Sequence, residues 1–224
     1  MTALGSPRLH LRETDSTNAR ARELALAGAL HGTLVTAAHQ TAGRGRQGRS
    51  WSAPPGRALL CSLILHGPPS PLTPLAAGVA VAELAGRDAL VKWPNDVLVD
   101  GLKVAGVLAE GRLQEGWVVL GIGVNVAARA EELPPLAGTL GLEQAAIETC
   151  LTKLLRGLER WLAATPDDVL ETLRARDALR GRAVSWGEGT GTADGIDGEG
   201  RLLVRTAGSG RVALGAGEVH LEPV

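Results

Sequence analysis

The sequence predicts an α/β protein of the α+β kind, followed by a small β-module. Three observations predict it. Short apolar runs bounded by glycine and proline recur as far as residue 126, as is typical of strands. Apolar residues at 154, 155, 158, 161 and 162 have the spacing of an amphipathic helix. After Arg180 glycine becomes dense and the apolar runs shorten. We therefore place a main domain at residues 1–179 and a β-barrel-like module at residues 180–224, which is marginally stable alone.

Caps, prolines and turns place the elements in order. Residues 15–17 offer capping oxygens ahead of the first helix, and Pro74 and Pro166 can each open a later one. Asp-Gly at 100–101 suits the two-residue turn of a β-hairpin. The expected helices span residues 18–30, 74–86, 151–162 and 166–179. The expected strands span residues 9–11, 33–38, 58–65, 90–93, 97–99, 102–110, 117–126, 202–206 and 211–214.

Composition narrows the class of protein. A formal net charge of -1 excludes bulk attraction to DNA or to an anionic membrane. No apolar run approaches the ~20 residues that span a bilayer, and the start of the chain lacks the apolar core of a signal peptide. Cys61 and Cys150 stand far apart, so free thiols are expected rather than a disulfide. We expect a soluble, cytoplasmic protein without nucleic-acid or membrane partners.

Rare residue types concentrate in a few segments. The chain has three lysines against twenty arginines, and only three asparagines. Asn18, Asn95 and Asn125, together with Lys92 and Lys103, all fall in the motifs described below. Because an ammonium is a compact point charge and a guanidinium is a planar fork, a retained lysine indicates a position that needs a point charge.

The segment 43–49 reads Gly-Arg-Gly-Arg-Gln-Gly-Arg and is followed by Trp51. Its glycines satisfy a dinucleotide-binding pattern, but Pro54 and Pro55 forbid the helix which that pattern requires, and no acid near residue 65 could hold a ribose. Glycines let a backbone lie close to a ligand, and guanidinium groups bind carboxylate or phosphate in bidentate fashion. The alternatives are a solvated basic loop or an RNA-binding patch, which the lack of interleaved aromatic residues weakens.

Charged residues surround the hairpin expected at 97–110. Lys-Trp-Pro-Asn-Asp at 92–96 precedes it, and Lys103 stands on its second strand ahead of five apolar or small residues. A lysine on a strand that enters the core needs a partner from the protein or from a ligand. The alternative is a hairpin-edge lysine that reaches water, with Asp96 and Asp100 as turn residues. That alternative suits Asp100, whereas a functional role is favoured for Asp96 and Lys103.

Two further motifs have structural explanations as well as functional ones. Gly121 and Gly123 interrupt an apolar strand that ends near Asn125. Glycine there marks the close approach of a ligand or of another segment, and the asparagine can read an adenine or a ribose. Taken alone, tight sheet packing explains the glycines better. Asp-Ser-Thr-Asn at 15–18 is explained in full by helix capping when taken alone.

Together and in this order, the segments resemble the bacterial biotin protein ligases. The resemblance spans about residues 10–224 and rests on D-S-T-N at 15–18, G-R-G-R-Q-G-R-S-W at 43–51, K-W-P-N-D at 92–96, G-L-K-V-A-G-V-L-A-E at 101–110, G-I-G-V-N at 121–125 and G-I-D at 195–197. It implies a catalytic domain like that of class II aminoacyl-tRNA synthetases and lipoate ligases, with a mixed or antiparallel sheet, and an SH3-like C-terminal domain. Repressor-type members carry a DNA-binding domain ahead of the first motif, and only 14 residues precede it here. DNA-binding repression is therefore not expected.

The resemblance also implies a reaction and roles by position. It implies that biotin is activated with ATP and Mg²⁺ to biotinyl-5′-AMP and transferred to a lysine of a biotin carboxyl carrier protein, by a monomer or a homodimer. The implied biotin-binding residues are Ser16, Thr17, Asn18, Gln40, Arg44, Gly45, Arg46, Lys103 and Gly106. The implied ATP or adenylate residues are Arg46, Arg49, Trp51, Asn95 and Asn125. The implied catalytic residues are Lys103, Arg44, Arg46 and Asp96, the last also a candidate Mg²⁺ ligand. The alternatives are a lipoate or octanoate ligase of the same superfamily, and a non-catalytic RNA-binding protein.

Overall fold

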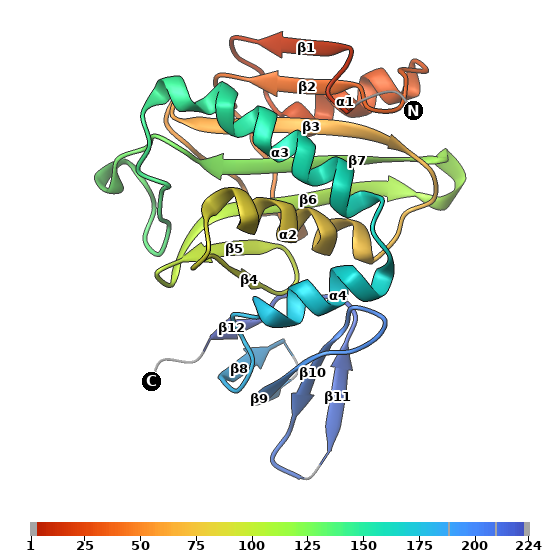
Figure 1. Cartoon of the computed structure of the whole chain (residues 1–224), viewed down its shortest axis with the longest axis vertical. Helices are drawn as coiled ribbons and strands as arrows, with labels where there is room; N and C mark the ends of the chain where they lie inside the picture. Colours follow the sequence, from red (N-terminus) through yellow and green to blue (C-terminus); the bar gives the residue numbers. More distant parts are fainter. Residues whose placement is uncertain (1–3, 188, 209, 222–224) are drawn as a thin grey trace.

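A seven-stranded mixed sheet organises the larger part of the chain. The computed structural model describes residues 4–187, 189–208 and 210–221, apart from the side chains of residues 112 and 113 (Figure 1). The strand order is β1-β2-β3-β7-β6-β5-β4; β1 and β2 are parallel and the other neighbours are antiparallel. The strands are β1 (Arg8–Leu11), β2 (Leu34–Ala37), β3 (Ala58–His66), β4 (Leu90–Lys92), β5 (Asp96–Val99), β6 (Leu102–Arg112) and β7 (Trp117–Asn125). The α/β class predicted from the sequence is confirmed.

Helices pack on both faces of this sheet. They are α1 (Thr17–Leu26), α2 (Leu72–Ala85), α3 (Ile147–Leu162) and α4 (Pro166–Ala175). Because successive side chains of a strand point to opposite faces, Leu63 and Ile64 of β3 belong to different cores. Leu63 lies in the large core with α2 and α3, which cross in front of the sheet in Figure 1, whereas Ile64 packs with Ala21 and Ala25 of α1. None of the described helices is long and apolar enough to cross a bilayer.

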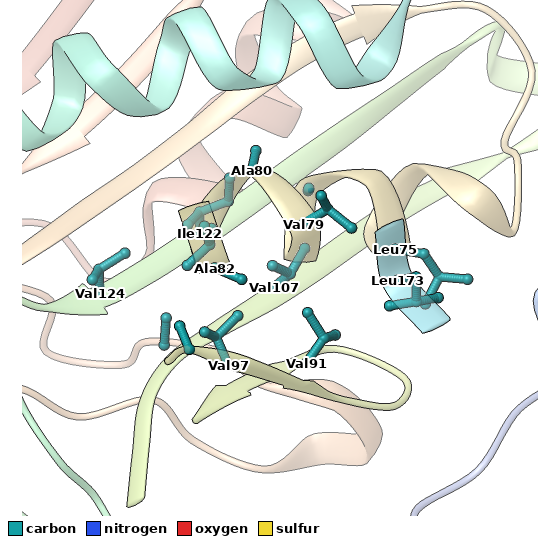
Figure 2. Packing of buried hydrophobic residues seen from close by; sticks show 14 of the residues in the cluster. Leu75, Val79, Ala80, Ala82, Val91, Val97, Val107, Ile122, Val124 and Leu173 are labelled. Carbon is teal, nitrogen blue, oxygen red and sulfur yellow. The ribbon is translucent and has the colours of Figure 1, made fainter. Parts of the chain in front are cut away.

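The large core is built from small apolar side chains. Figure 2 shows Val79 and Ala82 of α2 beside Val97, Val107 and Ile122, which come from three neighbouring strands. The chain contains no Phe or Tyr, so alanine and β-branched residues bring the helix close to the sheet. This packing fixes β6 and β7 in place on one face and leaves their other face available for a pocket.

The C-terminal module is a second, five-stranded antiparallel sheet in the order β11-β10-β9-β8-β12. Its strands are β8 (Ala183–Trp186), β9 (Gly189–Ile196), β10 (Leu202–Arg205), β11 (Arg211–Leu214) and β12 (His220–Leu221). Val184 and Leu202 belong to the large core, and the indole N–H of Trp93 donates a 2.9 Å hydrogen bond to the carbonyl of Gly200. The module is therefore packed on the main domain. The boundary between residues 179 and 180, which falls between α4 and β8, stays a prediction.

Several element boundaries differ from those expected. The first helix ends at Leu26 rather than at residue 30, because Gly28 adopts a φ of +85° and its N–H bonds the carbonyl of Ala25. The third helix begins at Ile147, earlier than expected. Strands β8, β9 and β12 were not predicted, since β9 reads Gly-Thr-Gly-Thr-Ala-Asp-Gly-Ile and lacks the alternating apolar residues that indicate a strand.

The hairpin of β5 and β6 has the predicted turn. Asp100 and Gly101 have φ values of 51° and 78°, both positive as a type I′ turn requires. The Lys103 N–H donates to the carbonyl of Leu136, and the Gly138 N–H donates to the carbonyl of Lys103, at 2.9 and 2.8 Å. A second loop therefore clamps the backbone of Lys103.

Replacing Leu154 of α3 by alanine tests the large core. The side chain is fully buried, so Leu154→Ala is expected to lower the free energy of unfolding by ~2–5 kcal/mol. Leu26→Ala removes the same atoms from a side chain that is 66% exposed and is expected to change it by less than ~1 kcal/mol. Urea unfolding followed by circular dichroism measures both variants. Equal losses would contradict the packing described.

Candidate active site

A pocket of about 90 Å³ lies on the face of the sheet that carries α1. It is bounded by the start of α1, the segment 40–51 and strands β6 and β7. Twelve of the predicted site residues line it: Ser16, Thr17, Asn18, Gln40, Arg44, Gly45, Arg46, Arg49, Trp51, Asn95, Lys103 and Gly106. Segments far apart in the sequence therefore meet in one place. Asp96 and Asn125 are not among the lining residues.

The floor of the pocket is flat because three strand positions have no side chain. Gly106 of β6 is paired with Gly123 of β7, and Gly121 follows on the same face. A Cβ on Gly123 would lie 2.5 Å from the Trp51 ring, and a Cβ on Gly121 would lie 2.0 Å from Asn18 Oδ1. Both distances are far inside van der Waals contact. The glycines thus allow Trp51 and Asn18 to lie directly against the strands.

One end of the pocket is a neutral hydrogen-bond network at the start of α1. Gln40 Oε1 accepts from the Thr17 N–H at 2.7 Å and lies 2.9 Å from the Thr17 hydroxyl. Ser62 Oγ of β3 lies 2.8 Å from Thr17 Oγ1 and 2.6 Å from Asn18 Oδ1. Asn18 Nδ2 donates to Glu110 Oε2 of β6 at 2.7 Å. Since Thr17, Asn18 and Ser62 are buried, this network holds their orientations.

Residues 15–18 do more than cap a helix. Ser16 occupies the N-cap position of α1, but its side chain makes no capping hydrogen bond. Its N–H donates to Asp15 Oδ1 at 2.8 Å, and the residue is only 2% exposed where it lines the pocket. The prediction that capping explains this motif in full is wrong, because Ser16 makes no side-chain cap and Thr17 and Asn18 bond to distant residues instead.

Residues 43–51, here called the lid, form a short turn over the pocket. The Gly45 N–H donates to the carbonyl of Arg49 at 2.7 Å, and the Trp51 N–H donates to the carbonyl of Gly43 at 2.9 Å. The next element is β3 rather than an α-helix. The rejection of a dinucleotide-binding loop is therefore confirmed.

Two arginines attach the lid to the rest of the molecule. Arg46 Nη1 donates to Asn95 Oδ1 at 3.3 Å, and Asn95 Nδ2 donates to the carbonyl of Val107 on β6 at 2.9 Å. Arg49 forms an ion pair with Glu218 of the C-terminal module. The lid therefore connects the hairpin of the main domain with the second sheet.

Lys103 has the partner that the sequence requires. Its Nζ lies 2.7 Å from Asp96 Oδ1, in an ion pair without an aligned hydrogen bond, and 5.7 Å from the centre of the Trp51 ring. The side chain is 33% exposed, so the ammonium is half-buried at the pocket rather than enclosed in the core. The side chain is exposed because the pocket is open to solvent. The apolar residues that follow Lys103 in the sequence did not indicate this exposure.

The cations around Lys103 outnumber the carboxylates beside them, which are Asp96 and Glu218. Burial lowers the pKa of the Arg46 guanidinium, and the positive charge of Arg49 lowers it further. Burial also lowers the pKa of the Lys92 ammonium, which Asp96 offsets in part. A lowered pKa in a base means that its charged form is destabilised, and an anion placed among these groups would relieve this. This end of the pocket is therefore suited to an anionic ligand.

Asp96 and Asn125 lie beside the pocket at the ends of β5 and β7, the two strands that flank β6. Asp96 on β5 is opposite Gly106 on β6. Asn125 ends β7 and is 2% exposed; its Nδ2 donates to the carbonyl of Gly138 at 2.8 Å, while its Oδ1 has no hydrogen-bond partner. The described residues contain no cluster of three His, Cys, Asp or Glu side chains able to hold a metal ion by themselves.

Two members of the network were not predicted. Ser62 is a polar residue inside the apolar run 58–65, and that anomaly was a usable signal. Glu110 ends a recognised motif, but its contact with Asn18 spans 92 positions in the sequence. No local pattern indicates such a contact.

Comparison with known proteins agrees with this geometry. The biotin/lipoate A/B protein ligase family matches residues 11–126, and the biotin protein ligase C terminal domain matches residues 186–221. The chain is 35% identical to a biotin–[acetyl-CoA-carboxylase] ligase of Mycobacterium tuberculosis, with 93% of this chain and 87% of that protein covered. It is 37% identical to a ligase of the same name from Paracoccus denitrificans, with 93% and 98% covered. The structure of biotin protein ligase from Aquifex aeolicus in complex with biotin and ATP has a TM-score of 0.79 at 28% identity, covering 98% of this chain and 100% of that one.

A mixed α/β sheet joined to a small five-stranded C-terminal sheet, with a pocket that has a neutral and a cationic end, is the arrangement of ligases that attach cofactors to proteins. The chain belongs to the biotin/lipoate A/B protein ligase family, and within it to the biotin protein ligases. The resemblance drawn from the motifs is confirmed. The class II synthetase-like catalytic domain and the SH3-like C-terminal domain are confirmed with it.

Adding one methyl group at the floor tests its flatness. Gly121→Ala is expected to lower the free energy of unfolding by ~1–3 kcal/mol, because Asn18 is held by Ser62 and Glu110 and cannot move aside. Gly198→Ala places its methyl group in open space and is expected to cost less than ~0.5 kcal/mol. Thermal and urea unfolding measure both variants. A Gly121→Ala protein as stable as Gly198→Ala would contradict the close approach.

Proposed function

We propose that the chain activates biotin with ATP as biotinyl-5′-AMP and transfers the biotinyl group to a lysine of a biotin carboxyl carrier protein. The observation that carries the proposal is a pocket whose neutral hydrogen-bonding end adjoins a cationic end. Biotin has the matching chemistry, with a neutral ureido ring at one end and a carboxylate at the other. The names of the relatives from Mycobacterium tuberculosis and Paracoccus denitrificans support the carboxylase carrier as acceptor.

The neutral end favours biotin over lipoate. A ureido ring offers N–H donors and a carbonyl acceptor, and Ser16, Thr17 and Gln40 present hydroxyl and amide groups to receive them. The dithiolane ring of lipoate offers no such hydrogen bonds and would leave these buried groups without partners. Sites built to hydrogen-bond a substrate reject analogues that lack the matching group.

Adenylation joins two negatively charged groups. An oxygen of the biotin carboxylate attacks the α-phosphorus of ATP, the bond to the β-phosphate oxygen breaks, and pyrophosphate leaves. The positive charges of Lys103, Arg46 and Arg44 offset this repulsion. Fixed positive charge at the reacting atoms is an efficient way to lower such a barrier. Asp96 holds the Lys103 ammonium in position.

Asp96 also fits a role beside Mg²⁺. One of its two carboxylate oxygens, Oδ1, lies 2.7 Å from Lys103 Nζ, and Mg²⁺ in nucleotide sites binds one or two carboxylates together with phosphate oxygens. When bound, Mg²⁺ would neutralise charge on the phosphates.

The nucleotide is proposed to lie on the hairpin side of the lid. The unpartnered Oδ1 of Asn125 is a buried acceptor that an amino group such as that of adenine would satisfy. Trp51 offers a flat apolar surface, and Arg49 and Asn95 lie beside it around the pocket. Binding of ATP would give Asn125 Oδ1 the partner that it lacks in the free chain.

In the second half-reaction the acceptor lysine, as the neutral amine, attacks the acyl carbon of the mixed anhydride. The new amide bond forms, the bond from the acyl carbon to the phosphate oxygen breaks, and AMP leaves. Water would destroy the anhydride, so a lid that orders over it protects the intermediate. Cys61 and Cys150 are both free and buried, which supports a reducing, cytoplasmic location.

Incubation with biotin, MgATP and a carrier domain tests the function. We expect the carrier lysine to gain the mass of one biotinyl group, as measured by mass spectrometry. Replacing biotin with lipoate is expected to give no mass gain. Modification by lipoate and not by biotin would overturn the proposal in favour of the related ligase.

Removing the Lys103 ammonium tests the cationic end. Lys103→Ala is expected to slow adenylation by a factor on the order of 10²–10³, as for loss of one preorganised electrostatic group. Lys103→Arg is not expected to restore the rate, since a planar fork does not replace a point charge. Single-turnover formation of biotinyl-AMP measures the effect, with Lys153→Ala, an exposed lysine of α3, as the matched control. An unchanged rate in Lys103→Ala would remove this residue from the mechanism.

Ligand binding is expected to order the lid. Amide hydrogen exchange in residues 43–49 should slow when biotin and MgATP are added, because the arginines then gain anionic partners. Residues 166–175 of α4, outside the pocket, serve as the internal control. Equal exchange of residues 43–49 with and without the ligands would contradict the lid.

A further inference from the structure

Glu110 lies outside the pocket and yet contacts the network that shapes its neutral end. It is on the same face of β6 as Gly106 but faces a separate cavity with Arg22 and Glu115. Arg22 is bonded to Glu115 at 3.2 Å, and among the described side chains Glu110 has no ion-pair partner. Its one hydrogen bond to a side chain within that part of the chain is the 2.7 Å contact with Asn18 Nδ2.

The contact between Glu110 and Asn18 fixes which atoms donate and which accept along the network. A carboxylate accepts hydrogen bonds, so Glu110 orients the Asn18 amide with Nδ2 toward Glu110 and Oδ1 toward Ser62. Ser62 has one hydroxyl hydrogen, and the amide oxygen 2.6 Å away can only accept it. The hydrogen of Ser62 is thereby committed to Asn18.

The hydroxyl of Thr17 is the next group in this network. Two acceptors lie near its hydroxyl: Ser62 Oγ at 2.8 Å and Gln40 Oε1 at 2.9 Å. The orientation of Gln40 is itself set by the Thr17 N–H, which donates to Oε1 at 2.7 Å. The single hydroxyl hydrogen of Thr17 therefore points into the network. The oxygen of Thr17 receives no hydrogen from this network and is left as an acceptor for a ligand in the pocket that Thr17 lines, and Gln40 is left with its amide N–H groups as donors.

We infer that Glu110 is a positioning residue that sets the hydrogen-bonding polarity of the neutral end, through Asn18, Ser62 and Thr17. This inference rests on the proposed function. It makes the pocket select ligands that bring an N–H donor to Thr17, as a ureido ring does. Without the Glu110 acceptor, the Asn18 amide can reverse and donate to Ser62. The hydroxyl hydrogen of Ser62 is then free to donate to the Thr17 hydroxyl oxygen, which leaves this oxygen with one acceptor position fewer for the ligand.

The test compares Glu110→Leu with Glu110→Gln in the full chain. Glu110→Leu removes the acceptor and is expected to raise the KM for biotin about tenfold, the effect of one misdirected hydrogen bond, with the KM for ATP and kcat at saturating biotin within about twofold of the wild type. Glu110→Gln keeps an amide oxygen for Asn18 and is expected to stay within about twofold of the wild type. Glu115→Gln, which alters the neighbouring carboxylate, is the matched control.

Two readouts separate positioning from loss of structure. The wild type should discriminate strongly against a biotin methylated on its ureido nitrogens, and Glu110→Leu should lose most of that discrimination. In a double-mutant cycle, Thr17→Val should abolish the effect of Glu110→Leu on biotin affinity measured by calorimetry. If Glu110→Leu fails to fold, Ser62→Ala breaks the same network from within and replaces it in the cycle.

Equal loss of biotin and ATP affinity, full additivity with Thr17→Val, or unchanged discrimination against the methylated analogue would each overturn the inference. These outcomes are distinguishable from failure of the proposed function. In that case the wild type itself would form no biotinyl-AMP from biotin and MgATP.

Discussion

The close approach of two chain segments to bare strand backbone is the constraint on which the site depends. Asn18 lies against Gly121 and Trp51 lies against Gly123, at distances that no side chain on these strands would permit. The first contact brings the start of α1 onto the sheet, where Thr17 and Asn18 meet Ser62 and Gln40. The second lets the lid fold down over the same strands. Both ends of the pocket therefore exist because β7 carries glycine at two positions on one face.

Charge is distributed unevenly along this pocket, and each end uses a different physical principle. The neutral end is buried and held by short hydrogen bonds between groups that cannot ionise at neutral pH, apart from Glu110 behind it. The other end holds more cationic than anionic side chains. Burial and the positive charge of Arg49 lower the pKa of Arg46 there. Such an arrangement is unfavourable in the free protein and becomes favourable when an anion binds. A glycine-rich lid suits this, because it can order at the moment when its arginines gain partners.

Much of the fold could be predicted because local sequence patterns determine its turns and helices. The Asp100-Gly101 turn was predicted correctly, since only residues that tolerate positive φ suit both central positions. The amphipathic stripe of α3 was predicted correctly because its leucines repeat with the helical period. The end of α1 was wrong by several residues, since the choice between Gly28 and Gly32 as terminator has no local signature. Strand β9 was missed because its burial comes from the neighbouring strands rather than from its own composition.

The candidate site could likewise be predicted only in part from the sequence. Residue types carried part of the chemistry: glycine-spaced arginines and a retained lysine favoured a site for carboxylate or phosphate, whereas the residues for a polar ligand came from the resemblance to a known family. Their convergence on one pocket, the pairing of Lys103 with Asp96, and the participation of Ser62 and Glu110 were decided by the tertiary structure. These features depend on contacts between residues as many as 92 positions apart. Sequence patterns report the conformational preferences of neighbouring residues, whereas the sheet order sets which distant residues share a face, and only the folded chain determines that.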